Sequence, residues 1–292
     1  MKSRTSNTLK NTAFAVLAQI LTQILGFVSR TIFIYYLGIE YLGVSGLFSN
    51  ILSFLSLAEL GIGSAIVYNM YKPIADNNEL KVKQLVNFYK KAYRYIIIAV
   101  IGIGISIIPF MDLIIKEKPN VTHLTLIYLL YLADTISTYF VAHKRSFIIA
   151  DQKDYVNTLN KQIFSFVQIV VDIVVLVLTQ NFILYLSLRV LITMLSNWRL
   201  SYIVDKLYPD LIDKTIEPLE KRERNVIFKH IRAMMYHSIG GVIVFSTDNI
   251  LISAFIGIVY VGIYSNYLLI IGVLVTVIGM FFNSAIASVG NL

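Results

Sequence analysis

The sequence contains no cysteine, and it is poor in charged residues and in proline. Of its 292 residues 14% are charged, against about 25% in soluble domains, and only five are proline. The missing cysteines exclude disulfides, thiol catalysis and cysteine-ligated metals. In contrast, 57% of the residues are hydrophobic and the mean hydropathy is +0.72. This composition predicts an integral membrane protein.

The sequence also lacks the motifs of the common enzyme classes. Its four histidines lie near the ends of apolar segments and show no metal-binding spacing. There is no Gly-x-Ser-x-Gly nucleophile turn and no P-loop, so neither acyl transfer nor ATP hydrolysis is indicated. We therefore predict that the protein is not an enzyme, and that it uses no cofactor and no metal. If the protein moves a solute across the membrane, the energy would come from an ion gradient or from the gradient of the solute itself.

Eight apolar segments predict membrane helices, each of which needs about 20 residues. The first follows a basic tail, as in a signal peptide, but it carries Gln19, Gln23 and Arg30 and shows no small-residue cleavage site, which predicts an uncleaved helix. Pro109 is expected to kink the third. The predicted fold class is all-α and polytopic, with helices over residues 13–36, 44–68, 95–115, 124–142, 162–178, 182–202, 234–255 and 261–282.

The lysines and arginines predict the orientation of these helices. With the N-terminus inside, Lys116 and Lys118 alone of the 25 lysines and arginines fall outside, and Arg30 and Arg189 alone lie at membrane depth. All the others fall in cytoplasmic segments. The positive-inside rule therefore predicts a cytoplasmic N-terminus.

Cytoplasmic loops are expected wherever these basic residues gather. Pro73 is predicted to end the second helix, and residues 72–94 are predicted to form a loop. His143, Lys144 and Arg145 mark the next cytoplasmic loop.

Three domains are predicted. Residues 1–203 form a six-helix transmembrane lobe, residues 204–232 a cytoplasmic linker with an amphipathic helix, and residues 233–292 the first two helices of a second lobe. The acidic and basic residues of the linker nearly balance, which argues against a nucleic-acid partner.

A short motif occurs twice. Leu37–Val44 reads LGIEYLGV and Ile256–Ile263 reads IGIVYVGI, and each copy lies between two long apolar runs. We expect a tight hairpin at both places, spanning Gly38 to Gly43 in the first copy. Internal duplication is a signature of secondary transporters, although a chance match between apolar segments is the alternative.

Ionisable and polar residues at membrane depth are the candidate site. An ionised side chain there costs about 2.5 to 3.5 kcal/mol on insertion scales, so a group of them favours a polar translocation cavity. The alternative is structural: the glutamines link helices, Arg30 extends to the outer surface, and each carboxylate is a hydrogen-bond partner. The candidates are Arg30, Glu59, Asp134, Asp172, Arg189 and Asp248, together with Gln19 and Gln23 on the face of Arg30.

The seventh helix has four consecutive polar residues, Ser246 to Asn249, at its middle. Polar groups on all sides of a membrane helix indicate a cavity or a locally unwound turn.

These features together resemble those of a known family. Three stretches carry the resemblance: YLGIEYLGVSGLFSNILSFLSLAELGIGSAIVYNMYKPIA, FSTDNILISAFIGIVYVGIYSNYLLI and the terminal SAIASVGNL. They look like a Wzx-type polysaccharide-biosynthesis flippase, of the superfamily that includes the multidrug (MATE) exporters. The resemblance implies two six-helix lobes around a central cavity in the bacterial inner membrane. The cargo would be an undecaprenyl-diphosphate-linked oligosaccharide, moved outward for capsule or O-antigen assembly.

The resemblance also implies roles and partners. Arg30, Glu59 and then Asp248 are the expected key positions, with arginines attracting the diphosphate and a carboxylate coupling movement to protons or sodium. Membrane lipids and the polysaccharide polymerase machinery are the other expected partners. Because the family has four more helices, we expect a C-terminally truncated chain, and a fragment that inserts without transporting is one hypothesis. Other hypotheses are a MATE-like drug antiporter coupled to cations and, less favoured, a membrane glycan polymerase or acyltransferase.

Overall fold

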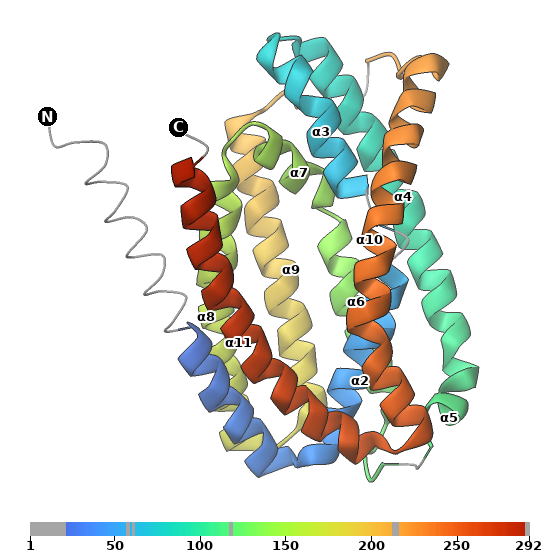
Figure 1. Cartoon of the computed structure of the whole chain (residues 1–292), viewed down its shortest axis with the longest axis vertical. Coiled ribbons are helices and arrows are strands. Elements are labelled where there is room, and N and C mark those ends of the chain that lie inside the picture. The colour runs from blue at the N-terminus through green and yellow to red at the C-terminus, as the bar shows by residue number, and fades with distance from the viewer. Residues whose placement is uncertain (1–21, 57–58, 60–61, 117–118, 212–215, 290–292) are drawn as a thin grey trace, which may run out of the picture.

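The computed structural model describes residues 22–289 except 57–58, 60–61, 117–118 and 212–215, and every element in this part of the chain is a helix (Figure 1). The all-α prediction is therefore confirmed for the residues described. A helical segment over residues 22–37 comes first. It is followed by α2 (Ile39–Leu55), α3 (Ile62–Ala75), α4 (Glu79–Ile107), the 3₁₀ turn η2 (Ile108–Phe110), α5 (Met111–Ile114), α6 (Leu124–Tyr139), α7 (Ala142–Ala150), α8 (Asp154–Thr179), α9 (Phe182–Leu207), α10 (Lys221–Phe255) and α11 (Ile258–Val289).

Most of the helices run roughly along the long axis of one bundle (Figure 1). By length and apolarity, 3 of the described helical stretches are long enough to cross a membrane, namely Glu79–Ile114, Asp154–Thr179 and Ile258–Thr276. A fourth is reached if α6 and α7, which meet at a bend of 41°, count as one broken span. The number of eight membrane helices therefore stays a prediction.

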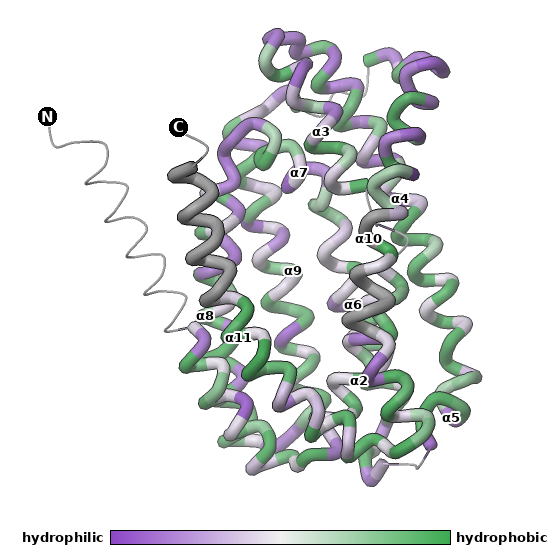
Figure 2. Tube along the Cα trace, viewed as in Figure 1, coloured by the Kyte–Doolittle hydropathy of each residue, from purple (hydrophilic) through white to green (hydrophobic). Residues whose placement is uncertain are grey.

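One end of the bundle is hydrophilic (Figure 2). It comprises the α3–α4 turn and the start of α10, and we call it the basic end because the lysines of α4 and the basic first turns of α10 lie there. The opposite end holds the turns before α2 and α11, and we call it the turn end (Figure 1). The positive-inside rule predicts that the basic end is cytoplasmic.

Several predicted helix boundaries are wrong at the basic end. Residues 72–94 are not a loop, because Pro73 lies inside α3 and α4 already begins at Glu79. Asn78 caps α4, since its side chain accepts a hydrogen bond from the backbone N–H of Lys81 at 3.0 Å. Lysine is a good helix former, so α4 includes its lysines instead of beginning at the apolar residues that follow them.

The predicted loop at His143 is wrong for a different reason. His143 and Lys144 lie in α7 and are 4% and 6% exposed. The ammonium of Lys144 donates to Asp205 at 2.6 Å and to Ser201 at 2.7 Å, both on α9. A buried lysine is tolerated here because its charge is paired and hydrogen-bonded.

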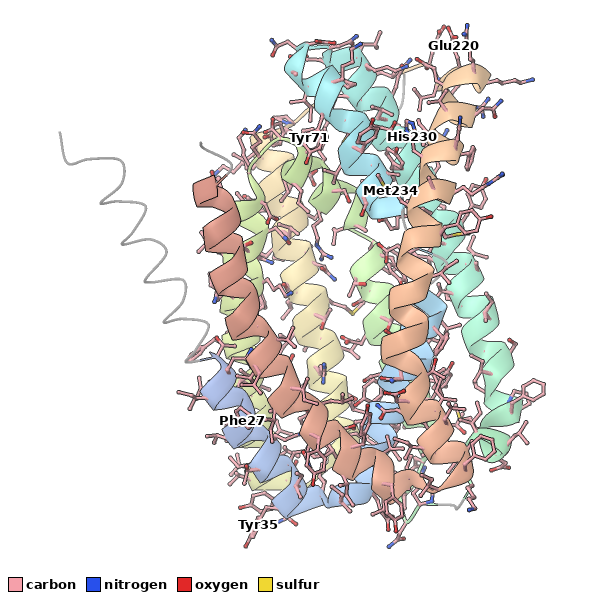
Figure 3. The ribbon with its side chains drawn as sticks, in the orientation of Figure 1. Phe27, Tyr35, Tyr71, Glu220, His230 and Met234 are labelled. Atoms are coloured by element: carbon pink, nitrogen blue, oxygen red, sulfur yellow. The ribbon has the colours of Figure 1, made fainter. Side chains whose placement is uncertain are left out.

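The predicted seventh helix begins earlier than expected. α10 runs without a break from Lys221 to Phe255, so the amphipathic segment is its first part and not a separate surface helix. Glu220, His230 and Met234 follow one another along it from the basic end (Figure 3). His230 lies 2.9 Å from the side chain of Asn69 on α3 and packs edge-on against Tyr68. The middle of α10 is not unwound.

The two copies of the repeated motif have the same local structure. Gly38 and Gly257 have φ values of 91° and 143°, and α2 and α11 begin at the very next residues. Such φ values favour glycine, because an L side chain would clash with the backbone. Each predicted hairpin is thus a break of one residue, and the boundaries predicted at residues 44 and 261 are wrong.

The two copies also contact each other reciprocally. A Cβ atom on Gly43 would lie 2.1 Å from the carbonyl oxygen of Ile258, and a Cβ atom on Gly262 would lie 2.5 Å from that of Ile39. Ile39 corresponds to Ile258 in the motif, and Gly43 to Gly262, so this is one contact made twice. A reciprocal contact of this kind marks a local two-fold axis between α2 and α11.

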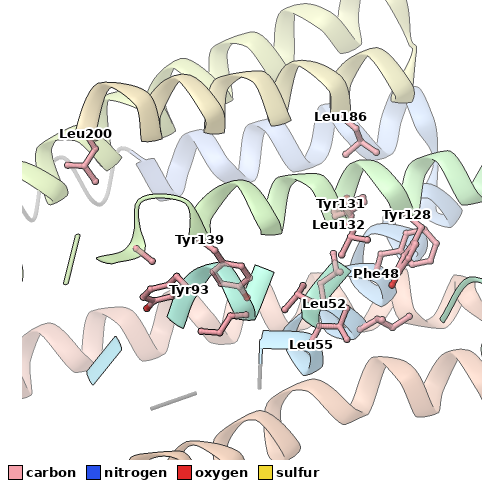
Figure 4. Packing of buried hydrophobic residues seen from close by; sticks show 14 of the residues in the cluster. Phe48, Leu52, Leu55, Tyr93, Tyr128, Tyr131, Leu132, Tyr139, Leu186 and Leu200 are labelled. Carbon is pink, nitrogen blue, oxygen red and sulfur yellow. The ribbon is translucent and has the colours of Figure 1, made fainter. Parts of the chain in front are cut away.

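The apolar core supports this arrangement. Phe48 of α2 is fully buried and packs edge-on against Tyr128 of α6, with ring centroids 5.3 Å apart. The hydroxyl of Tyr128 donates to the carbonyl of Gly104 on α4 at 2.9 Å, so three helices meet there. Figure 4 shows Leu52, Leu132 and neighbouring residues filling the space around them.

Candidate functional site

A cavity of about 630 Å³ is lined by the helical segment over residues 22–37 and by α2, α6, α8, α9, α10 and α11. Its lining is rich in polar groups, which come from all of these elements except α8. The polar lining residues are Ser29, Arg30, Ser45, Ser49, Asn50, Tyr131, Tyr185, Arg189, Asn249 and Ser265. The reciprocal α2–α11 contact adjoins this cavity, since Gly46 lines it and a Cβ atom there would meet the hydroxyl of Ser265 at 2.6 Å.

Arg30 is held in the cavity by neutral acceptors of α11. Its Nε donates to Oδ1 of Asn266 at 3.1 Å, and its second terminal nitrogen donates to the carbonyl of Ser265 at 2.9 Å. These bonds orient the guanidinium without neutralising its charge. A guanidinium held by neutral acceptors, with no ion pair to the residues that the structure describes, matches the bidentate geometry of carboxylate and phosphate groups.

Arg189 of α9 joins this cavity to a second one of about 610 Å³, because it lines both. The second cavity lies among residues 22–37, α6, α7, α8 and α9, and its charged lining residues are Asp134, Arg145, Lys161, Asp172 and Arg189. Nε of Arg189 lies 4.0 Å from Oδ2 of Asp134, so the ion pair is loose. The combined space therefore runs from the α11 side into the interior of the N-terminal helices.

The two carboxylates of the second cavity have different environments. Asp172 of α8 is 7% exposed and accepts a hydrogen bond from Nε2 of Gln168 at 2.6 Å. Oδ1 of Asp134 is buried and has no hydrogen-bond partner among the residues that the structure describes. Buried polar atoms are normally paired, so Oδ1 of Asp134 is available to a proton or a cation.

The remaining candidates lie elsewhere. Glu59 lies between α2 and α3 and accepts a hydrogen bond from the hydroxyl of Tyr93 at 2.9 Å, and it does not line either cavity. Asp248 is exposed, accepts a hydrogen bond from the hydroxyl of Tyr264 at 2.6 Å and does not line the first cavity. Gln23 also lines neither cavity, and Gln19 lies outside the described residues.

Asn249, which the sequence interpretation did not select, lines the first cavity in place of Asp248. Its side chain is 3% exposed, and its amide nitrogen lies 3.5 Å from the Cβ position of Gly46. The repeat contains the signal that identifies it. Extending the alignment that pairs Gly38 with Gly257 back along the chain pairs Arg30 with Asn249.

Among the described residues, no group of three or more His, Asp or Glu side chains could hold a metal ion. The described lining of the two cavities therefore consists of three arginines, one lysine, two carboxylates and neutral polar and apolar groups.

Comparison with known proteins identifies the family. Residues 8–287 match the family described as polysaccharide biosynthesis protein. The chain belongs to this family. The match confirms the resemblance seen in the sequence, and with the apolar helices it makes the chain a multi-pass membrane protein.

A solved structure has the same fold. It is described as the inward-facing conformation of a multidrug resistance MATE family transporter of the MOP superfamily. The TM-score is 0.62 at 18% identity, and the match covers 83% of this chain and 56% of the transporter. The chain thus spans little more than half the length of that protein. No protein of curated function matches the sequence significantly.

Proposed function

We propose that this protein acts in the translocation of a lipid-linked oligosaccharide, carried on undecaprenyl diphosphate, across the bacterial inner membrane. The observation that carries the proposal is the shared cavity of Arg30 and Arg189. Two guanidinium groups that line one polar space suit a diphosphate, whose oxygens accept paired N–H donors. The volume is within the range of about 300–1,000 Å³ that is usual for ligand sites.

The neutral polar groups of the same cavity suit the sugars. Ser49, Asn50 and Asn249 offer donors and acceptors for hydroxyl groups, and Tyr131 and Tyr185 offer ring faces. The lipid tail would remain in the bilayer, since it gains nothing from a polar site. Membrane lipids and the polymerase that consumes the flipped unit are the proposed partners.

Asp134 and Asp172 are the proposed positions for the coupling ion, a proton or sodium. Support comes from the buried Oδ1 of Asp134, which has no hydrogen-bond partner within the described part of the chain, and from Arg189, which lines both cavities. A ligand phosphate that attracts Arg189 would loosen its 4.0 Å pairing with Asp134 and change the affinity of that carboxylate for a cation.

The same second cavity favours one alternative, a cation-coupled drug antiporter. A cationic drug would be attracted to Asp134 and Asp172, whereas the cations that line the cavities, Arg30, Arg145, Lys161 and Arg189, would repel it. Efflux of ethidium driven by a proton or sodium gradient, with intact surface polysaccharide in a strain lacking the gene, would support the antiporter.

The flippase proposal is tested by replacing Arg30 in a strain that depends on this gene for its surface polysaccharide. Arg30→Ala should abolish surface polysaccharide and cause lipid-linked units to accumulate at the cytoplasmic face, with unchanged abundance in the membrane. Arg222→Ala is the matched control, because Arg222 is exposed at the start of α10 and lines neither cavity. Normal polysaccharide in the Arg30→Ala strain would contradict the proposal.

A further inference from the structure

A separate pocket of about 350 Å³ lies at the basic end, between α4, the segment that precedes α10, and the first turn of α10. It shares no residue with the two cavities described above. The residues that line it are Gln84, Asn87, Phe88, Lys90, Lys91, Arg94, Ile216, Glu217, Pro218, Leu219 and Arg224.

The walls of this pocket are fixed by contacts at its edges. An ion pair between Lys81 and Glu223 ties α4 to the first turn of α10. Nε2 of Gln84 donates to the carbonyl of Glu217 at 3.1 Å, which holds the segment before α10 against α4. Phe88 packs edge-on against Phe228, with ring centroids 6.0 Å apart. The pocket is therefore formed before any ligand binds.

Its electrostatic character is strongly positive. Lys90, Lys91, Arg94 and Arg224 contribute cations, and Glu217 is the only carboxylate among the lining residues. Nε of Arg224 is buried without a hydrogen-bond partner among the described residues. An unpaired buried donor is costly, and an anionic oxygen in the pocket would satisfy it.

The pocket lies at the level where a lipid headgroup would be. Arg94 is followed directly by Tyr95, which is 73% exposed, and then by the apolar part of α4, where Ile98 is 61% exposed. Tyrosine at the start of an exposed apolar helix marks the membrane–water interface. Arg94 therefore lies where phosphate groups of the inner leaflet are expected.

We propose that this pocket binds the phosphate group of an anionic membrane lipid, in a site separate from that of the transported substrate. Basic pockets between membrane helices on the cytoplasmic side suit such headgroups. Phosphatidylglycerol supplies a phosphodiester, whose one negative charge is shared by two oxygens that can accept hydrogen bonds from Arg224 and Arg94. Inorganic phosphate shares this chemistry, and the experiment separates the two.

The test compares two double variants of the whole chain in detergent. Lys91→Gln/Arg94→Gln removes two cations from the pocket, and both positions are exposed, so the fold should be retained. Lys229→Gln/Arg232→Gln is the matched control, since it removes one lysine and one arginine from exposed positions of α10 that do not line the pocket. Melting temperature and binding are measured with phosphatidylglycerol, phosphatidylcholine and inorganic phosphate.

The wild type should bind phosphatidylglycerol in preference to phosphatidylcholine. The pocket variant should bind phosphatidylglycerol about 30-fold more weakly, because it lacks two protein cations and each lysine or arginine near a headgroup contributes about 1 kcal/mol. The control should lose less than about twofold in affinity. An equal loss in both variants would reduce the effect to general surface charge and overturn the proposal. Equal stabilisation by millimolar phosphate would identify a soluble ligand instead, and absence of any preference would also refute it.

Discussion

The reciprocal contact between α2 and α11 gives a sharp prediction about the turn end. In Gly43→Ala the new methyl carbon would lie 2.1 Å from the carbonyl oxygen of Ile258. A carbon and an oxygen in contact are normally about 3.3 Å apart, so the two backbones would have to separate by about 1 Å. The obstacle is backbone on both sides, so no side chain can rotate away to relieve it.

The energetic cost can be estimated from packing. Overpacking a well-packed contact costs about 1–3 kcal/mol, which for a chain of this size lowers the melting temperature by about 2–10 °C. If the contact exists only in the state in which the turn end is closed, the population of that state relative to the open one falls by a factor of about 5–150.

The missing cysteines make the population shift measurable. Ser49 lines the first cavity, so Ser49→Cys introduces a single thiol there. A membrane-impermeant maleimide added from outside should label this thiol slowly in the parent protein and faster when Gly43→Ala is added. The melting temperature of each variant is measured in parallel in detergent.

A graded series of glycine variants provides the controls. Gly262→Ala should act like Gly43→Ala, because its Cβ would lie 2.5 Å from the carbonyl oxygen of Ile39. Gly46→Ala should act less, since the atom it meets is the Ser265 hydroxyl, which can rotate. Gly102→Ala meets nothing within 4 Å and should leave melting and labelling unchanged. Unchanged melting and labelling in both Gly43→Ala and Gly262→Ala would refute the packing argument.

Two further predictions concern the basic end. Asp205→Ala should lower the free energy of unfolding by about 1–3 kcal/mol, because it leaves buried Lys144 without its carboxylate. Adding Lys144→Met should recover most of this loss. Thermal melts that show no recovery in the double variant would contradict this prediction. Hydrogen bonding to Asp151 raises the pKa of Lys153, and burial raises the pKa of Tyr208. Both groups stay protonated to higher pH in the folded state than in the unfolded state, so the folded protein should lose stability as the pH rises above about 10. The loss of melting temperature per pH unit should be smaller in Tyr208→Phe. Equal losses in the two proteins would argue against a role for Tyr208.

The apolar parts of the fold could be predicted from the sequence, whereas the helix ends could not. Hydropathy identified the parts of α4, α8 and α11 that are long and apolar enough to cross a membrane. It placed the starts of the third and seventh helices just after Arg94 and Arg232, yet α4 starts at Glu79 and α10 at Lys221. Basic residues continue a helix readily, and a membrane boundary does not stop one. The hydrogen bonds that fix helix ends, such as that of Asn78, do not affect hydropathy.

The candidate site was predicted in part, for a reason of helix geometry. Arg30, Arg189, Asp134 and Asp172 all line the two connected cavities. Asp248 does not line them, because neighbouring residues on an α-helix point about 100° apart and Asn249 takes the inward position. The choice between adjacent polar residues needs the phase of the helix, which four consecutive polar residues do not reveal.

The repeat explains both that phase and the charge of the cavity. Arg30 of the first copy donates to the carbonyl of Ser265, and its counterpart Asn249 lies beside Gly46, the counterpart of Ser265. The two residues therefore occupy equivalent places across the local two-fold axis, but only one is charged. The α2–α11 contact is reciprocal in backbone, whereas the cavity beside it is asymmetric in charge, because Arg30 and Arg189 both lie on the N-terminal helices. An anion in this space would therefore be drawn toward the N-terminal helices, where Arg189 lies 4.0 Å from Asp134. Anion binding and the binding of a cation to the Asp134 carboxylate would then be coupled through the Arg189 side chain.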